Sequence, residues 1–110
     1  MTEEIIEEGK IPAIVSYLTI IGLIIAYYMN GEKKNPFAYF HMRQSLGLWL
    51  TFFALGFVIS SFDSWFATIG FYMFFGVLFI YSFMTAVSGR ADHTPVVGKF
   101  FQKLFSSIGK

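Results

Sequence analysis

The sequence predicts an all-α integral membrane protein with three transmembrane helices and a C-terminal amphipathic helix in the membrane interface. Long apolar runs cover residues 11–29, 46–62 and 65–87, and no charged residue interrupts them. A helix needs about 20 consecutive apolar residues to cross a hydrocarbon core about 30 Å thick. The composition agrees, because only 14% of the residues are charged, against about 25% in soluble domains. We therefore expect one membrane domain over residues 1–110.

The amino-terminal segment, residues 1–10, carries four glutamates and a single lysine. A secretory signal peptide opens with a basic stretch, so this segment is expected to be an acidic tail outside the cell and not part of a cleaved signal. The first span, residues 11–29, should accordingly stay in the mature protein.

The second and third spans are predicted to form a helical hairpin over residues 36–62 and 65–88. Asn35 followed by Pro36 is a strong helix start, since asparagine caps free backbone N–H groups and proline suits the first helical position. The turn around Asp63 is so short that the two helices must be antiparallel neighbours. Residues equally far from this turn should lie at similar depth.

Depth matching brings polar residues of these two helices together near the inner end of the hairpin. The candidate polar membrane cluster contains His41, Arg43, Gln44, Tyr81, Ser82 and Thr85. Taken alone, Arg43 needs no functional explanation, because its guanidinium can reach lipid phosphates. His41 and Gln44 could simply form hydrogen bonds to the neighbouring helix. Polar groups at membrane depth are costly, however, and the group together exceeds what anchoring requires. The cluster is therefore a candidate functional site.

The C-terminal segment, residues 96–108, has the clearest helical periodicity in the chain. Its apolar face contains Val97, Phe100, Phe101, Leu104, Phe105 and Ile108, and its lysines take the other face. This pattern is typical of a helix in the headgroup plane that binds anionic phospholipid, although a partner protein could also cover it. The candidate lipid or partner face comprises Lys33, Lys34, Arg90, His93, Lys99, Phe100, Phe101, Lys103 and Phe105.

Loop charges predict the orientation in a plasma membrane. Seven of the eight lysines and arginines fall after the first or the third span: Lys33, Lys34, Arg43, Arg90, Lys99, Lys103 and Lys110. Only Lys10 falls on the other side. Short loops rich in lysine and arginine stay in the cytoplasm, so we expect the N-terminus outside and the C-terminus inside.

Chemical motifs are sparse. The chain has no cysteine, and its two histidines and Asp92 do not have the spacing of metal ligands on one element. No nucleophile and base occur together, and no glycine-rich phosphate loop is present. A net charge of +1 gives no attraction to nucleic acid. We expect no catalytic residue, no cofactor, no metal and no nucleic-acid partner.

Several segments resemble one family of small bacterial multi-pass membrane proteins. They are the loop that ends in Lys33–Phe37, the run Phe40–Leu48, the tight hairpin and the final stretch Gly89–Phe105. That family is related to the inner-envelope import component of the chloroplast Tic translocon. The resemblance implies a multi-pass protein of a bacterial inner membrane, of uncharacterised function, that could be an accessory to a membrane complex.

Two functions follow from these observations. The first is a non-enzymatic accessory or scaffold subunit of a membrane complex, whose basic cytoplasmic face binds anionic lipid or a partner protein, which could be a second copy of the chain. The alternative is an oligomeric pore or a protein-import component, in which His41, Arg43 and Gln44 line a water-filled path. One three-helix unit is too small to enclose a pore, so the alternative requires several copies.

Overall fold

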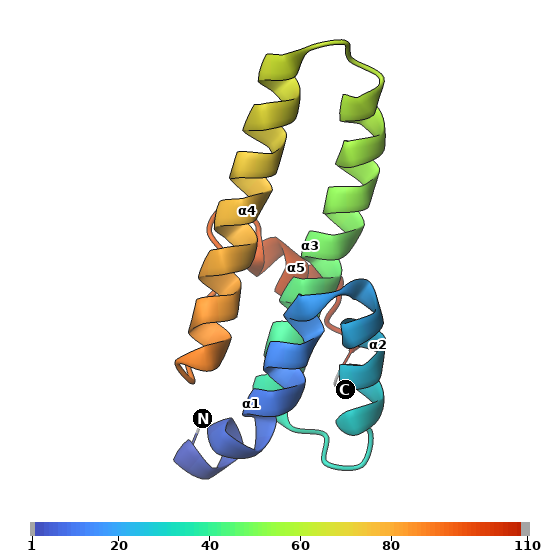
Figure 1. The fold of residues 1–110 in the computed structure, drawn as a ribbon. Helices are drawn as coiled ribbons and strands as arrows, with labels where there is room; N and C mark the ends of the chain where they lie inside the picture. The colour runs from blue at the N-terminus through green and yellow to red at the C-terminus, as the bar shows by residue number, and fades with distance from the viewer. Residues whose placement is uncertain (1, 109–110) are drawn as a thin grey trace.

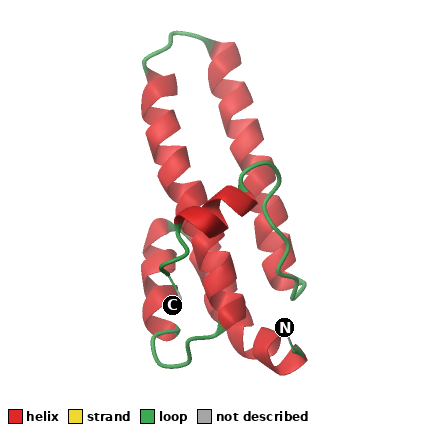
Figure 2. Ribbon diagram, turned by 180° about the vertical axis from the view of Figure 1, so that it is seen from behind, coloured by secondary structure: helices red, strands yellow, loops and turns green. Residues whose placement is uncertain are grey.

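The computed structural model describes residues 2–108, which form helices and connecting turns without a β-strand (Figure 1). The helices are α1 (Glu3–Leu18), α2 (Ile20–Met29), α3 (Pro36–Ser60), α4 (Trp65–Val87) and α5 (Gly98–Leu104). A long hairpin of α3 and α4 forms the body of the molecule. A shorter hairpin of α1 and α2 packs against one half of it (Figure 1), and α5 crosses the opposite side of α3 (Figure 2).

The α3–α4 hairpin confirms the two helices predicted from the sequence. Pro36 is the first residue of α3, and the Asn35 side chain accepts hydrogen bonds from the N–H groups of Phe37 and Ala38. The Ser64 hydroxyl accepts a hydrogen bond from Ala67 at the start of α4. These caps satisfy backbone donors that have no partner within the helix. Both helices are long and apolar enough to cross a membrane.

The half of the hairpin next to its turn, which we call the turn end, has an apolar exterior. Trp65 and Phe66 are 84% and 92% exposed, and Phe57 is also mostly exposed. Asp63 is the only charged residue between Gln44 and Gly89. A soluble protein rarely exposes so large a continuous apolar surface. Length, composition and exposure together support a membrane protein with two spanning helices.

The first predicted span, residues 11–29, is not one helix. Thr19 adopts an extended backbone conformation, which separates α1 from α2, and the chain reverses there (Figure 1). The ten residues of α2 are about 15 Å long, which is half of what a spanning helix needs. Within residues 2–108, the helices long and apolar enough to span are α3 and α4, and residues 11–29 belong to an α1–α2 hairpin.

Contacts within the α1–α2 hairpin and contacts with α3 together explain this break. The Thr19 hydroxyl accepts a hydrogen bond of 2.9 Å from the N–H of Gly22 and so caps α2. A Cβ atom at Gly22 would lie less than 3.0 Å from the carbonyl oxygen of Val15, so only glycine permits the close approach of the two helices. The last turn of α1 is bonded to α3, since the carbonyl of Ser16 accepts hydrogen bonds from Ser45 and Trp49.

The amino-terminal residues are helical and pack against other parts of the chain. Residues 3–10 form the first turns of α1 and are not an extended tail. The side chain of Asn35 donates a 2.7 Å hydrogen bond to the carbonyl of Ile5, and Lys10 lies beside Gly89. The start of α1, the α2–α3 loop and the end of α4 therefore form one end of the molecule, which we call the basic end (residues 3–10, 30–36 and 87–93). Residues 3–10 thus lie close to the α2–α3 loop.

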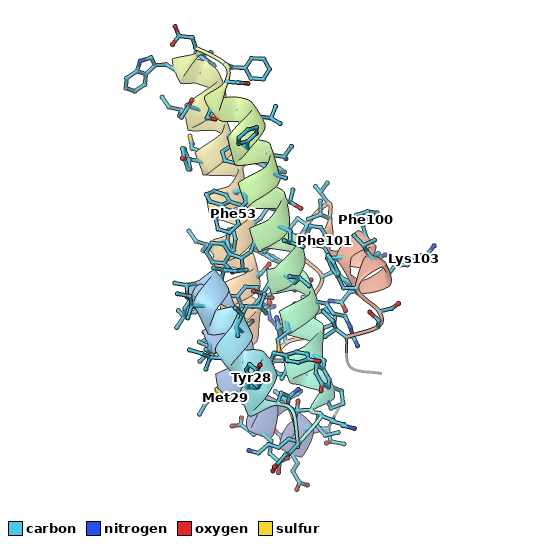
Figure 3. All side chains as sticks on the ribbon, turned by 90° about the vertical axis from the view of Figure 1, so that its right-hand side faces the viewer. Tyr28, Met29, Phe53, Phe100, Phe101 and Lys103 are labelled. Carbon is cyan, nitrogen blue, oxygen red and sulfur yellow. The ribbon has the colours of Figure 1, made fainter. Side chains whose placement is uncertain are left out.

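The helix predicted over residues 96–108 is shorter in the structure and begins later. Val96 has a φ of 73°, a left-handed conformation that ends any helix passing through it, so α5 begins only at Gly98. The ring of Phe101 is buried against Gly47, where a Cβ would lie less than 3.0 Å from it. Phe100 and Lys103 point away from the hairpin (Figure 3). The segment is thus a docked helix with one buried aromatic residue.

Candidate functional site

A buried chain of hydrogen bonds links α1, α3, α4 and the α4–α5 loop in the half of the hairpin nearer the basic end. Its side chains belong to Tyr17, His41, Gln44, Ser82 and Thr94, and all five are buried. We call these residues the polar core. Around it lie the apolar residues of the main core cluster, among them Ala13, Phe37, Leu48 and Ala86.

The direction of each hydrogen bond in the polar core follows from its ends. The carbonyl of Arg90 can only accept, so Nε2 of His41 donates to it over 2.8 Å. Nδ1 of a neutral imidazole then accepts from the Tyr17 hydroxyl over 2.7 Å. That hydroxyl in turn accepts from Nε2 of Gln44 over 3.1 Å, and Oε1 of Gln44 accepts from the Thr94 N–H over 2.6 Å. The donors and acceptors match along the whole chain when His41 is neutral.

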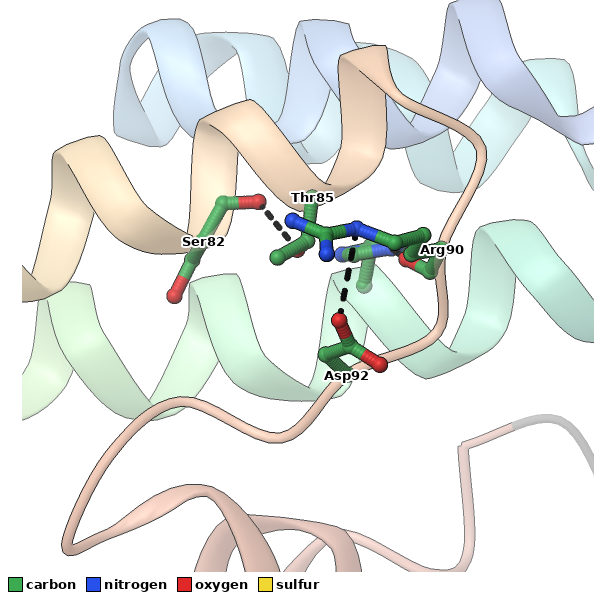
Figure 4. Close-up of polar contacts among 5 residues, drawn as sticks. Ser82, Thr85, Arg90 and Asp92 are labelled. Carbon is green, nitrogen blue, oxygen red and sulfur yellow. Dashed lines mark hydrogen bonds and ion pairs between the residues drawn. The ribbon is translucent and has the colours of Figure 1, made fainter.

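The polar core continues into α4 and the segment that follows it. The hydroxyls of Ser82 and Thr94 lie 2.6 Å apart, and Thr85 donates a hydrogen bond of 2.8 Å to the carbonyl of Ser82. Arg90 and Asp92 form an exposed ion pair of 3.4 Å just beyond the end of α4 (Figure 4). Within residues 2–108, every buried side-chain nitrogen and oxygen has a hydrogen-bond partner. The polar core is therefore a satisfied network that fixes the packing of the helices.

Arg43 belongs to a different group of contacts, on the side of α3 that faces the C-terminal segment. Its Nε and Nη2 atoms donate to the carbonyl of Ile108 over 2.9 Å and 2.6 Å, and Nη1 donates to Gln102 over 3.3 Å. Gln102 donates to the carbonyl of Phe40 over 2.8 Å. The ion pairs of the described residues join Lys10 to Glu7 and Arg90 to Asp92, so within them the charge of Arg43 faces no carboxylate.

The structure divides the candidate polar membrane cluster into three parts. His41, Gln44 and Ser82 join the polar core, and Thr85 bonds to its edge. Arg43 contacts the C-terminal segment. Tyr81, which is 40% exposed, points out of the bundle. The structure therefore brings four of the six predicted residues together and places Arg43 and Tyr81 elsewhere.

Sequence reasoning missed Tyr17 and Thr94, which complete the polar core. Tyr17 lies in an otherwise apolar run, and its position one turn after Ala13 and next to Ser16 is the available signal, since the three form one small or polar helix face. Thr94 is bonded through its backbone N–H as well as its hydroxyl. A backbone contact of this kind leaves no trace in residue types.

The candidate lipid or partner face is dispersed over two regions. Lys33 and Lys34 are exposed in the α2–α3 loop, and Arg90 and His93 are exposed at the other side of the basic end, where His93 packs edge-on against Phe40. The remaining members lie in or next to α5, about halfway along α3: Lys99, Phe100, Phe101, Lys103 and Phe105. Of these, Phe101 is buried and Phe105 is half-buried, so they hold α5 in place.

The histidines do not come together with acidic side chains. His41 is enclosed by Tyr17 and the Arg90 carbonyl, while His93 lies on the surface. Within the described part of the chain, no group of three histidine, cysteine, aspartate or glutamate residues could hold a metal ion.

Comparison of the chain with protein-family models, with curated proteins and with solved structures gave no match.

Proposed function

We propose that this chain is a small, non-enzymatic membrane protein, an accessory or scaffold subunit that presents a basic cytoplasmic face to anionic lipid or to a partner protein. In this proposal α3 and α4 are the spanning helices. The α1–α2 hairpin enters the bilayer from the cytoplasmic side, turns at Thr19 and returns. Both ends of the chain then lie in the cytoplasm of a bacterial cell.

The distribution of charge is the observation that carries this proposal. Within residues 2–108, the lysines and arginines lie at the basic end, on the adjoining turns of α3 or on α5. The only charged residue of the turn end is Asp63. A loop without lysine or arginine is the kind that is translocated, whereas loops rich in these residues stay in the cytoplasm. With α1 at the basic end, Lys10 joins the other cationic residues, and the asymmetry becomes stronger than the sequence alone predicted.

The length of the hairpin gives the depth of each site in this proposal. About 20 helical residues cross a hydrocarbon core of about 30 Å, so a core that begins at the turn ends near His41 on α3 and near Thr85 on α4. The α1–α2 hairpin then reaches about the middle of the bilayer at Thr19. Non-helical backbone at that depth needs partners for its polar groups, and Thr19, although exposed, has them: its hydroxyl accepts from the N–H of Gly22 and its carbonyl accepts from the N–H of Leu23.

The polar core favours the scaffold over the oligomeric pore. A pore lining needs polar groups that face a water-filled path. His41 and Gln44 instead bond to α1 and to the segment after α4 of the same chain, and both are buried. The polar core therefore fixes the position of the α1–α2 hairpin, which leaves the exposed basic residues as the surface for recognition.

The resemblance to the bacterial relatives of the Tic import component agrees with an accessory role. The residues that carry it include Phe40, His41 and Gln44, which pack or bond inside the hairpin. A shared motif of this kind would preserve the fold of the family. We propose membership on these grounds, and a role in import does not follow from them.

Photocrosslinking in native membranes tests the proposed function. A photoreactive residue in place of Lys34 or Arg90 samples the basic face, and one in place of Trp65 is the matched control at the exposed turn end. We expect adducts with a defined second membrane protein from the first two positions and not from the third. Self-adducts alone, from all three positions, would contradict the scaffold and favour the oligomeric pore.

A further inference from the structure

An apolar groove runs between α2 and α3 on the flank of the molecule next to Arg43. It has a volume of about 270 Å³ and is lined by Leu23, Ile24, Tyr27, Met42, Leu46 and Ile108, among others. Ligand pockets for whole small molecules begin at roughly 300 Å³, so this groove suits a single slender chain. Tyr28, on the last turn of α2, is at its edge (Figure 3).

The groove changes in character along its length. Leu23 and Leu46 lie towards the middle of the hairpin, while Tyr27 and Tyr28 lie towards the basic end, because α2 and α3 run in opposite directions. In the membrane placement proposed above, the leucines are in the hydrocarbon and the tyrosines are near the headgroups. Tyrosine is enriched at that level because its ring is apolar and its hydroxyl is polar. The groove therefore lies parallel to the acyl chains of the inner leaflet.

Arg43 supplies a cation at the headgroup end of the groove. The guanidinium bonds to the carbonyl of Ile108, a residue that also lines the groove. A guanidinium has five N–H donors, of which three are used here, and no described carboxylate neutralises its charge. Arg43 is only partly buried. A phosphate oxygen would satisfy both the free donors and the charge.

We propose that the groove and Arg43 form one binding site for an anionic glycerophospholipid of the inner leaflet. One acyl chain lies in the groove, and the lipid phosphate accepts hydrogen bonds from the Arg43 guanidinium. The site rests on the proposed function for its orientation in the membrane, and it adds a specific ligand to the general basic face. Charge complementarity selects the lipid over a second protein helix, because a helix would need a carboxylate at the one position opposite Arg43.

Native mass spectrometry of the delipidated protein in detergent tests this site. The probes are phosphatidylglycerol and phosphatidylcholine with identical chains, and inorganic phosphate is added as a competitor in a separate arm. Both lipids carry the phosphodiester, so the discrimination comes from the choline cation of phosphatidylcholine, which the Arg43 charge repels. We expect one bound phosphatidylglycerol with about tenfold preference over phosphatidylcholine, which corresponds to about 1.4 kcal/mol. Equal retention of the two lipids would overturn the proposal. So would displacement of the lipid by millimolar inorganic phosphate, because the site would then recognise a free anion.

Two variants separate the parts of the site. Ile24→Trp fills the groove from an exposed position and should reduce retention of both lipids about tenfold. Ile21→Trp is the matched control, because Ile21 is on the same helix, is 65% exposed against 54% for Ile24, and does not line the groove. Arg43→Gln should abolish the preference for phosphatidylglycerol. Unchanged retention by Ile24→Trp overturns the site even if Arg43→Gln fails to fold.

The failure of this site and the failure of the proposed function give different results. Loss of lipid preference, with partner adducts at Lys34 and Arg90 intact, would overturn the lipid site alone. Loss of those adducts, with a groove-dependent lipid preference intact, would overturn the scaffold function and leave the lipid site standing.

Discussion

Replacement of Tyr17 by phenylalanine tests the polar core with the smallest chemical change. The substitution keeps the aromatic ring and removes one hydroxyl. That hydroxyl donates to Nδ1 of His41 and accepts from Nε2 of Gln44, and both partners are fully buried. Tyr17→Phe therefore leaves one buried acceptor and one buried donor without partners, while the packing stays the same.

The expected cost follows from these two lost bonds. A buried polar group that loses its partner costs about 1 to 3 kcal/mol, and hydrogen bonds between membrane helices average about 0.6 kcal/mol with a maximum near 1.7. Two such groups are left, and neither has access to solvent. We expect Tyr17→Phe to lower the free energy of unfolding by about 2 kcal/mol, a value that both scales allow for two lost hydrogen bonds.

Unfolding in mixed micelles, followed by the fluorescence of Trp49, measures this change. Trp49 packs against Phe52 and Phe79 and bonds to the carbonyl of Ser16, so its environment reports on the contact between α1 and α3. Tyr28→Phe is the matched control, because Tyr28 is 79% exposed and its loss of a hydroxyl should change stability by less than about 0.5 kcal/mol. A Tyr17→Phe protein as stable as the control would refute the polar core as the tie between α1 and α3.

Three further substitutions test single contacts. Gly22→Ala places a Cβ against the carbonyl of Val15 and should destabilise the α1–α2 hairpin by about 1 to 3 kcal/mol in the same unfolding experiment. Gly47→Ala displaces the ring of Phe101, so α5 should undock and tryptic cleavage after its lysines should become faster. Asn35→Ala removes the cap of α3 and the bond to α1, with an expected loss of about 1 to 2 kcal/mol.

Matched controls are available in α4 for the two glycine substitutions. Gly70 and Gly76 have open space where a Cβ would be. Alanine at either position should be neutral or stabilising, by up to about 1 kcal/mol, because alanine favours helix more than glycine does. If Gly22→Ala and Gly70→Ala shift stability alike, the close approach at Thr19 is not important. For Gly47→Ala, an unchanged tryptic pattern would contradict the docking of α5, and a stable Asn35→Ala protein would contradict the role of the cap.

The α3–α4 hairpin was predictable because its signals are local. Asn35, Pro36 and Ser64 cap helices through nearby backbone groups, and a long apolar run has few alternatives to helix. The depth matching across a short turn likewise brought His41, Gln44 and Ser82 into one group correctly. The boundaries of both helices agree with the prediction to within about two residues, which is the usual uncertainty of helix ends.

The break at Thr19 was not predictable, because the signals that determine it are not all local. Residues 11–29 are as apolar as a spanning helix, and hydropathy does not distinguish one long helix from two short ones. The break depends on contacts with α3 that are distant in sequence, such as the bonds from Ser45 and Trp49 to Ser16. The count of loop charges assumed a single helix over residues 11–29, whereas the structure places Lys10 next to Gly89 at the basic end.

The side of the membrane on which residue 2 lies tests the central claim most directly. The chain has no cysteine, so single cysteines can be introduced without background. Thr2→Cys reports on the start of α1, with Ser64→Cys at the turn end and Ser107→Cys in the C-terminal segment as controls; all three positions are exposed. With a membrane-impermeant maleimide on intact cells, we predict labelling at position 64 and none at 2 or 107 until the membrane is permeabilised. Labelling at position 2 in intact cells, with none at 107, would contradict the two-span arrangement and restore three spans.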